Sequence, residues 1–376
     1  MNQTANIEYL LTPGPLTTTL SVKQAMLRDW GSRDLGFIAI TSNIRERLVK
    51  MVGGEDTHVC VPVQGSGTFA VEATLGTLVP KSGKVLVLVN GAYGRRVEEI
   101  LSRLGREYLT HETDEDVPCS VQKLDEDLMR DPSITHVVIV HCETTSGLLN
   151  PVQEVARVVA NHGRRLMVDS MSAFGAIPID VNSCPFDALI ASSNKCLEGV
   201  PGIGYAIIRK ESLREAEGNS HSLSLDLYDQ WRGFHKNGQW RFTPPTHVLA
   251  SFEQALLEHE EEGGVRGRGA RYQENCDVLM EGMVEMGFKP FLSVELQAPI
   301  ILTFYSPADG NFDFEIFYKY LAEKGYLIYP GKLTRKASFR IGCIGQVHPG
   351  QMREALSAIR DTINRMGVKS CAPDLN

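Results

Sequence analysis

Two side chains with complementary chemistry, Lys195 and Asp169, stand at the ends of successive apolar runs. Lys195 follows residues 188–194, and Asp169 ends residues 165–169. A lysine amine can form a Schiff base with an aldehyde, and a carboxylate can keep a pyridine nitrogen protonated so that the ring accepts electrons. Each residue alone is ordinary. Both in this order predict a pyridoxal phosphate site in which Lys195 and Asp169 are catalytic.

The sequence Gly-Ser-Gly-Thr-Phe-Ala at residues 65–70 follows a predicted strand and opens a predicted helix. Small residues let backbone N–H groups approach an anion, and a helix N-terminus adds a favourable potential. We therefore expect Ser66, Gly67 and Thr68 to bind a phosphate. The same residues match the dinucleotide fingerprint G-x-G-x-x-A, which expects an acidic residue at the end of the next strand. That strand ends at Asn90, so the nicotinamide alternative is disfavoured.

Three further candidates depend on their position along the predicted elements. Tyr93 follows the predicted strand at residues 84–89, where an aromatic ring can stack on a flat cofactor or pack within the protein. Residues 141–147 follow another strand, and their hydroxyl groups suit either ligand contacts or a turn with a helix cap. Arg340 lies in a predicted strand, where its guanidinium can bind a carboxylate or phosphonate, or form a structural ion pair.

Strongly apolar runs alternate with helix-like stretches through the first two-thirds of the chain. Nearly continuous apolar strands indicate burial on both faces, which is typical of a mostly parallel sheet covered by helices. The alternation predicts a doubly wound α/β domain. Strands are predicted at residues 58–63, 84–89, 135–140, 166–168, 188–191 and 205–208, and helices include residues 68–78 and 152–161.

The pattern changes after residue 250. The glycine-rich residues 262–269 predict either a hinge or a surface turn. A smaller α+β domain is expected beyond it. Its predicted helices are residues 272–286, 313–324 and 349–366, its predicted strands are residues 300–305 and 339–341, and a helix at residues 251–261 precedes it. We divide the chain into an N-terminal segment (1–15), a large cofactor-binding domain (16–255) and a small C-terminal domain (256–376).

Composition and charge describe an ordinary globular protein. The chain of 376 residues is 43% hydrophobic and 22% charged, with a formal net charge of −8 and no long basic block. A nucleic-acid surface is therefore disfavoured, and no apolar run is long enough to cross a bilayer. Residues 1–8 do not have the pattern of a signal peptide. Eight scattered cysteines without a C-x-x-C pair predict reduced thiols in a cytoplasmic protein, with neither disulfides nor a metal site.

Together these residues resemble a known family. The chain is similar over nearly its whole length to the fold-type I pyridoxal phosphate enzymes, in the branch that includes alanine–glyoxylate aminotransferase. Within this branch it is most similar to members that transfer the amino group of 2-aminoethylphosphonate to pyruvate. The stretches that carry the resemblance are residues 11–17, 29–34, 65–68, 169–170, 192–195, 241–245 and 339–342.

The resemblance implies a mostly parallel seven-stranded sheet in the large domain, a smaller α+β domain, and roles for the cofactor-binding residues. Lys195 would form the Schiff base with pyridoxal 5'-phosphate, Asp169 would pair with its ring nitrogen, and Tyr93 would stack on the ring. Ser66, Gly67, Thr68 and Asn194 would bind the phosphate. Thr144 would reach the ring oxygen or its surroundings.

The same resemblance implies a homodimer in which Thr243 of the partner subunit helps to bind the phosphate. Arg340 would hold the anionic group of the substrate, with Arg33 as a helper. The products would be phosphonoacetaldehyde and L-alanine, in phosphonate catabolism.

Three alternatives are weighed against this hypothesis. Alanine–glyoxylate or serine–glyoxylate aminotransfer uses the same scaffold. Cysteine desulfurisation is disfavoured, because no cysteine lies between residues 311 and 340, where the resemblance would place a catalytic loop. A pyridoxal phosphate-binding regulatory or scaffold protein without turnover is the non-enzyme alternative. The retained Lys195 and the lack of an attached DNA-binding segment disfavour it.

Overall fold

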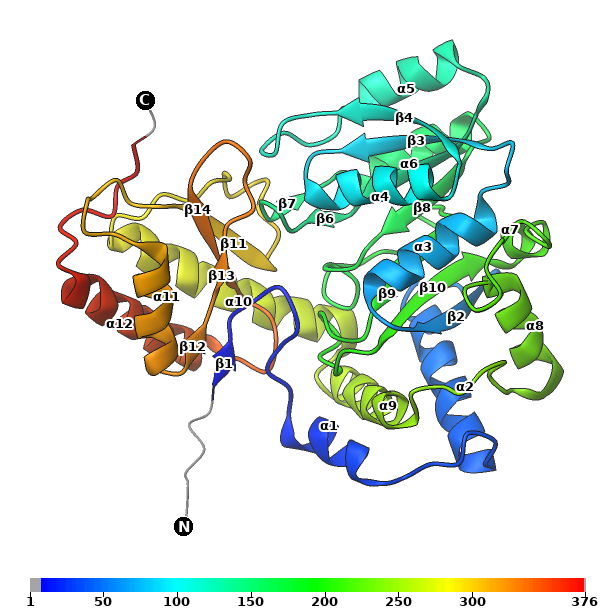
Figure 1. Cartoon of the computed structure of the whole chain (residues 1–376), viewed down its shortest axis with the longest axis horizontal. Helices are drawn as coiled ribbons and strands as arrows, with labels where there is room; N and C mark the ends of the chain where they lie inside the picture. The colour runs from blue at the N-terminus through cyan, green and yellow to red at the C-terminus, as the bar shows by residue number, and fades with distance from the viewer. Residues whose placement is uncertain (1–7, 375–376) are drawn as a thin grey trace.

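The predicted α/β domain is built around one central sheet (Figure 1). In the computed structural model, which describes residues 8–374, seven strands lie in the order β2, β10, β9, β8, β5, β3, β4. β10 is antiparallel to both of its neighbours, and the other pairs are parallel. The predicted fold class is therefore confirmed. The strands are β2 (His58–Gln64), β3 (Lys84–Val89), β4 (Glu107–Glu112), β5 (Ile134–Val140), β8 (Arg165–Asp169), β9 (Ala188–Ser192) and β10 (Ile203–Arg209).

The central strands feed two apolar layers, because successive side chains of a strand point to opposite faces. In β3, Leu86 and Leu88 join one layer, whereas Val85, Val87 and Val89 join the other. The first layer is covered by α2 (Leu35–Lys50), α5 (Val121–Arg130), α6 (Val152–Asn161) and α9 (Thr246–Glu261). The second is covered by α3 (Gly67–Leu78), α4 (Ala92–Arg103), α7 (Lys210–Arg214) and α8 (Leu227–Asn237). Burial on both faces explains the continuous apolar runs of these strands.

The strand β4 is not predicted by any apolar run of the sequence. It forms the edge of the sheet beside β3, and only His111 of its six residues is buried. An edge strand can face water, so polar side chains are tolerated there and the apolar alternation is lost. The pairing with β3, rather than a local pattern, defines this strand.

A smaller α+β unit lies beside the large one (Figure 1). Its three strands are antiparallel in the order β11, β14, β13, and an apolar core joins them to three helices. The N-terminal strand β1 pairs with β12, and Leu11 lies in the same core. The elements are β1 (Tyr9–Leu10), α10 (Gly264–Glu285), β11 (Ile301–Tyr305), α11 (Phe314–Glu323), β12 (Tyr326–Leu327), β13 (Tyr329–Pro330), β14 (Ser338–Gly342) and α12 (Pro349–Met366). The short elements elsewhere are α1 (Leu20–Gln24), η1 (Ala25–Leu27), β6 (Cys142–Glu143) and β7 (Leu148–Leu149).

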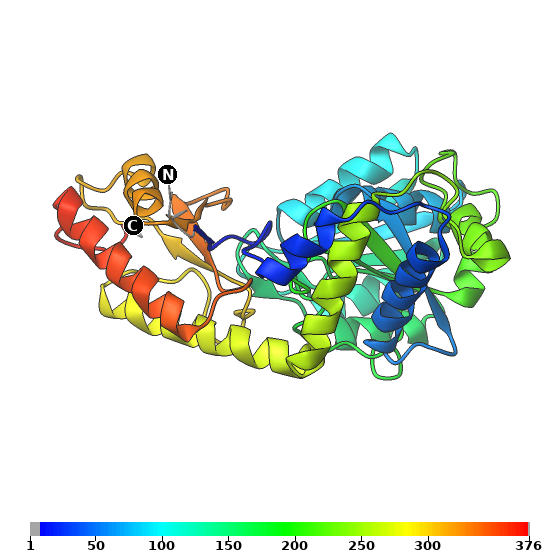
Figure 2. The same ribbon diagram turned by 90° about the horizontal axis from the view of Figure 1, so that it is seen from below.

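The glycine-rich stretch at residues 262–269 is mostly helical, so the prediction of a hinge or turn is wrong for most of it. The helical conformation is interrupted at Gly263, where φ is +102°. The next helix, α10, begins at Gly264 rather than at Tyr272. A Cβ at Gly269 would collide with the carbonyl oxygen of Ala176, so this glycine permits close packing of the helix. Figure 2 shows α10 (yellow) continuing from α9 along the lower edge of the small unit in that view.

The division of the chain into domains stays a prediction. Its second boundary, between residues 255 and 256, falls within α9. The predicted N-terminal segment contains β1, which pairs with the small unit. The absence of a signal peptide was predicted from residues 1–8, of which residues 1–7 lie outside the described residues.

Three observations apply to residues 8–374. No helix among them is long and apolar enough to cross a membrane. No group of three or more His, Cys, Asp or Glu side chains in that range could hold a metal ion. All eight cysteines lie in this range, and each is buried and free.

Candidate active site

The carboxyl ends of neighbouring strands bring the predicted site residues together. β8 ends at Asp169, β9 ends just before the turn that carries Lys195, and β2 and β3 lead into α3 and α4. These segments line a cavity of about 220 Å³ at the edge where open α/β sheets bind ligands. Seven predicted site residues line the cavity: Ser66, Gly67, Thr68, Tyr93, Asp169, Asn194 and Lys195.

Lys195 is held at the cavity by the N-terminal segment. Its Nζ donates to the carbonyl oxygens of Pro13 at 2.6 Å and Gly14 at 3.4 Å. Gly14 has a φ of +108°, and a Cβ there would lie 2.7 Å from Lys195 Cδ, so this close approach requires glycine. Burial lowers the pKa of the Lys195 amine. The neutral amine, which attacks carbonyls and removes protons, is therefore more accessible than in a solvated lysine.

Asp169 is a buried carboxylate at the end of β8. Its Oδ1 accepts a hydrogen bond from the Met171 N–H at 3.0 Å, and the residue is 5% exposed. Burial raises the pKa of Asp169 to about 6, against the opposing influence of the Arg96 and Lys195 charges. A protonated ring nitrogen beside this carboxylate would favour its ionised form and compensate for the lost hydration.

The N-terminus of α3 offers free donors for an anion. Ser66 precedes the helix, and its side chain makes no capping hydrogen bond. Arg96 Nη1 donates to Thr68 Oγ1 at 3.3 Å, which brings a guanidinium to the same turn. A Cβ at Gly67 would collide with the Met171 thioether. Uncapped N–H groups, two hydroxyls and a guanidinium together suit a phosphate.

Tyr93 is the aromatic side chain of the cavity. Arg96 Cζ lies 4.8 Å and Lys332 Nζ lies 5.1 Å from the centroid of its ring. Burial raises the pKa of Tyr93, but a hydrogen bond with Thr144 and the charge of Lys195 outweigh burial, so the pKa is lowered overall. The ring therefore lies in a positively charged environment.

Thr144 and Arg340 lie next to the cavity but do not line it. Arg340 Nη1 donates to the Thr144 carbonyl oxygen at 2.7 Å, and Nε donates to the Pro330 carbonyl oxygen at 3.0 Å. Arg340 is 1% exposed. The two residues thus link the Tyr93 region of the large unit to β14 of the small one.

In the single chain, Arg33 and Thr243 lie outside the cavity. Both residues are exposed, and neither lines the cavity. Thr243 follows Phe242, which is 47% exposed, in the segment between α8 and α9. The roles of these two residues, like the other residue roles implied by the resemblance, stay predictions.

Two residues that matter to the cavity were not singled out from the sequence. Arg96 lies one helical turn after Tyr93, so the i, i+3 spacing on α4 could have indicated it. Glu143 is fully buried, and its carboxylate accepts from the Thr145 N–H at 3.1 Å and the Tyr93 N–H at 3.3 Å. It therefore satisfies donors at the start of α4, which lacks a side-chain cap of its own.

A buried ion network lies behind the Lys195 turn. Arg268 Nη1 donates to the Cys196 carbonyl oxygen at 2.5 Å. Arg271 donates to Glu198 Oε1 at 2.8 Å and to the Gly345 carbonyl oxygen at 2.6 Å. Glu198 has a φ of +56°, which is uncommon for a residue with a side chain. The network thus ties the lysine turn both to α10 and to the loop after β14.

The residues of the cavity fit pyridoxal phosphate in the chemistry of their donors and acceptors. Lys195 offers an amine with a lowered pKa, and Asp169 offers a buried carboxylate whose desolvation a cationic ring would relieve. The uncapped start of α3 offers N–H groups to the phosphate. These features lie around one cavity.

Comparison with known proteins agrees with this chemistry. A family described as Aminotransferase class-V matches residues 21–335 of the chain. The chain belongs to the class-V aminotransferase family. Its aminotransferase fold is shared with the alanine–glyoxylate aminotransferase from Nostoc sp., with a TM-score of 0.88 at 22% identity over 96% of this chain and 97% of that one. The pyridoxamine–pyruvate aminotransferase from Mesorhizobium loti has a TM-score of 0.89 at 23% identity, over 98% and 95% of the two chains.

Relatives within the class-V aminotransferases are much more similar in sequence. The 2-aminoethylphosphonate–pyruvate transaminase from Pseudomonas fluorescens (strain Pf0-1) is 55% identical over 359 residues, which are 96% of this chain and 97% of that protein. The protein of the same name from Cupriavidus necator (strain H16) is 54% identical over 98% of each chain. The family resemblance expected from the sequence is therefore confirmed.

We expect Lys195 to be the attachment point of the cofactor, because it is the only lysine among the lining residues of the cavity. Borohydride reduction of the protein loaded with pyridoxal phosphate should label the peptide that contains Lys195, as measured by mass spectrometry. Lys195→Ala should abolish the label and lower turnover by about 10²- to 10⁴-fold, the usual contribution of a positioned acid–base group. The control variant Lys81→Ala, at an exposed position, should keep both the label on Lys195 and the wild-type turnover. Labelling at another lysine would contradict the assignment.

Asp169→Asn should change how the stability of the cofactor-free protein depends on pH. The pKa of Asp169 is raised from 3.8 to about 6, so the folded protein holds this proton more tightly than the unfolded chain. The wild type should lose stability relative to the variant as pH rises through that interval, by at most about 3 kcal/mol. Urea unfolding of both proteins across the interval measures the difference. If the stabilities of the two proteins changed in parallel with pH, the raised pKa of Asp169 would be refuted.

Proposed function

We propose that this chain transfers the amino group of 2-aminoethylphosphonate to pyruvate, giving phosphonoacetaldehyde and L-alanine, with pyridoxal phosphate as cofactor. The observation that carries the proposal is its identity of 52–55% with bacterial proteins named for this reaction, over 96–98% of the chain. The lysine, the carboxylate and the anion-binding turn around one cavity support the same conclusion.

Pyridoxal phosphate, when bound, supplies an aldehyde for the lysine and an electron-accepting ring. Lys195 supplies the amine, and its lowered pKa suits Nζ to take a proton from the amino-bearing carbon of the substrate and to return one. The Pro13 carbonyl oxygen orients that amine by a hydrogen bond of 2.6 Å. Asp169 would keep the ring nitrogen protonated, and Tyr93 would stack on the ring.

The phosphate of the cofactor is bound at the start of α3 in this proposal. Ser66, Gly67 and Thr68 contribute backbone N–H groups and hydroxyls, and Asn194 lies in the same cavity. Arg96 adds a positive charge through its contact with Thr68. A dianionic phosphate is stabilised by both the helix N-terminus and this guanidinium.

The anionic group of the substrate is held by Arg340 in this proposal. Nε and Nη1 of Arg340 donate to backbone carbonyl oxygens, so the guanidinium is fixed in place by Pro330 and Thr144. Its remaining nitrogen, Nη2, makes no hydrogen bond with the described residues and is free for an anion. Arg33 would help only from an exposed position.

Amino transfer from alanine or serine to glyoxylate remains a second candidate on this scaffold. The alanine–glyoxylate aminotransferase from Nostoc sp. shares the fold, but its identity is only 22%. The relatives with 52–55% identity do not favour this alternative. A regulatory role without turnover is likewise not supported, because these relatives are named as enzymes.

We also infer a cytoplasmic homodimer in which Thr243 of the partner subunit contacts the phosphate. Phe69 and Phe242, 50% and 47% exposed, line a groove of about 300 Å³ next to the phosphate turn. Large exposed apolar side chains of this kind mark interfaces, and Thr243 adjoins them. Eight buried free thiols are compatible with a reducing cytoplasm.

A screen of amine donors and keto acceptors tests the proposed reaction. With 2-aminoethylphosphonate and pyruvate, the loaded enzyme should form L-alanine, as measured by chromatography. The kcat/KM for 2-aminoethylphosphonate should exceed that for serine by at least about 100-fold, the discrimination expected when a built ionic contact is lost. A preference for serine with glyoxylate would instead establish the second candidate.

Phe242→Asp should weaken the dimer, because it places a charge in an apolar contact. Sedimentation velocity should show a dimer for the wild type and a shift toward the monomer for the variant. The matched control is Met129→Asp on α5, where the native side chain is 60% exposed and lies outside this groove. A wild-type monomer would contradict the inference.

A further inference from the structure

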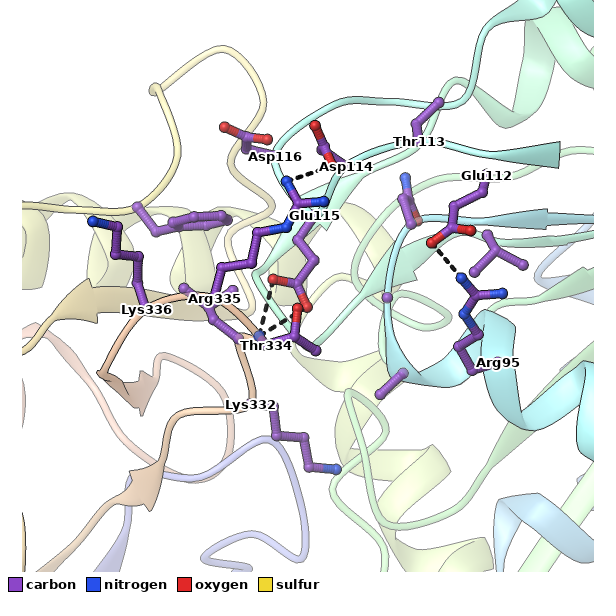
Figure 3. A pocket seen from close by; sticks show the side chains of 16 residues that line it. Arg95, Glu112, Thr113, Asp114, Glu115, Asp116, Lys332, Thr334, Arg335 and Lys336 are labelled. Atoms are coloured by element: carbon purple, nitrogen blue, oxygen red, sulfur yellow. Dashed lines mark hydrogen bonds and ion pairs between the residues drawn. The ribbon is translucent and has the colours of Figure 1, made fainter. Parts of the chain in front are cut away.

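A second and larger cavity adjoins the candidate active site. It has a volume of about 620 Å³ and includes Gly91 and Ala92, the residues just before Tyr93. One wall is the acidic loop, residues 112–116, and the opposite wall is the basic strap, residues 332–336 (Figure 3). The basic strap connects β13 to β14 and therefore precedes Arg340 closely in the chain.

The basic strap is docked on the acidic loop across this cavity. Arg335 Nη1 lies 3.0 Å from Asp114 Oδ1, and the Thr334 N–H donates to the two Glu115 carboxylate oxygens at 3.3 and 3.2 Å. Figure 3 shows these side chains pointing toward one another. Exposed ion pairs contribute little free energy. These contacts therefore favour one position of the strap but stabilise it only weakly.

Lys332 of the basic strap does not take part in this docking. Its amine points away from the acidic side chains (Figure 3), and it forms no ion pair within residues 8–374. Its Nζ instead lies 5.1 Å from the centroid of the Tyr93 ring, and its charge acts on the titration of both Tyr93 and Lys195. Lys332 is thus a cation that contacts the Tyr93 ring without an ion pair among the described residues.

Binding of a phosphonate would require more positive charge than Arg340 alone supplies. Nε and Nη1 of Arg340 already donate to carbonyl oxygens, so Nη2 is the one nitrogen of this guanidinium that makes no hydrogen bond with the described residues. A phosphonate, like a phosphate, presents three oxygens and up to two negative charges. A carboxylate presents two oxygens and one charge, so it needs less positive charge around it.

We propose that Lys332 is a specificity-determining residue that binds the phosphonate of the amino donor together with Arg340. Docking of the basic strap on the acidic loop sets the position of its amine. Lys332 therefore favours a phosphonate amine over a carboxylate amine at the same site. This inference rests on the proposed function, because it concerns the substrate of that reaction.

The test compares Lys332→Gln with Lys336→Gln, which removes the same charge from the same strap. The half-reactions with 2-aminoethylphosphonate and with L-alanine are measured separately on the loaded enzymes. Lys332→Gln should lower kcat/KM for the phosphonate amine by about 10- to 100-fold, the range for a lost charged hydrogen bond. It should change kcat/KM for alanine by less than about threefold. Lys336→Gln should leave both values at the wild-type level.

Binding provides a readout that does not depend on turnover. Titration calorimetry with methylphosphonate and with acetate should show that Lys332→Gln weakens only methylphosphonate, by about tenfold or more. Asp114→Asn, which undocks Arg335, should raise the KM for 2-aminoethylphosphonate and leave kcat unchanged. An unchanged KM in that variant would overturn the role of the docking.

The outcomes separate this inference from the proposed function. A wild-type enzyme that uses alanine but not 2-aminoethylphosphonate would refute the proposed function itself. A wild-type enzyme that uses 2-aminoethylphosphonate, with an unaltered phosphonate-to-alanine ratio in Lys332→Gln, would refute only the role of Lys332. An equal loss for both donors would show a general electrostatic effect and would also refute its specificity.

Discussion

The parallel pairing of β8 with β9 is the constraint on which the candidate site depends. The register pairs Asp169 with Ile190, so both strands reach the same edge of the sheet before the chain turns toward Lys195. A slip of one residue would direct the Asp169 side chain to the opposite face of the sheet. Both strands are buried almost throughout, so they are held by packing on both faces of the sheet. The sheet thereby sets the position of the carboxylate relative to the amine.

The electrostatics of the site differ from those of the whole chain. The protein carries a formal net charge of −8, yet Arg96, Lys195 and Lys332 gather around the ring of Tyr93. Asp169 is the acidic side chain that lines the smaller cavity. A positively charged site in a protein of negative net charge attracts anionic ligands locally. The rest of the surface does not thereby favour non-specific binding of nucleic acids.

Prediction from the sequence succeeded where short segments determine their own structure. The apolar run of β3 and the strand end at Asp169 are local signals, and both were located correctly. β4 has no such signal, because its polar residues are stabilised only by pairing with β3. The role of Glu143 was also missed, since it contacts Tyr93 across 50 residues of sequence. Arg33 and Thr243 are exposed and do not line the cavity of the single chain, so their predicted roles could not be checked in the same way.

The buried ion network behind the lysine turn has a geometric consequence. Arg268 and Arg271 belong to α10, and they bind the backbone after Lys195 as well as the loop that follows the strand of Arg340. Tyr272 strengthens the same connection, since its hydroxyl bonds to Glu198 at 2.5 Å and to the Gly345 N–H at 3.2 Å. One helix, α10, thus contacts both the turn that carries Lys195 and the loop that follows the strand of Arg340. The distance between the Lys195 amine and the Arg340 guanidinium is therefore set by the contacts of α10 with both segments.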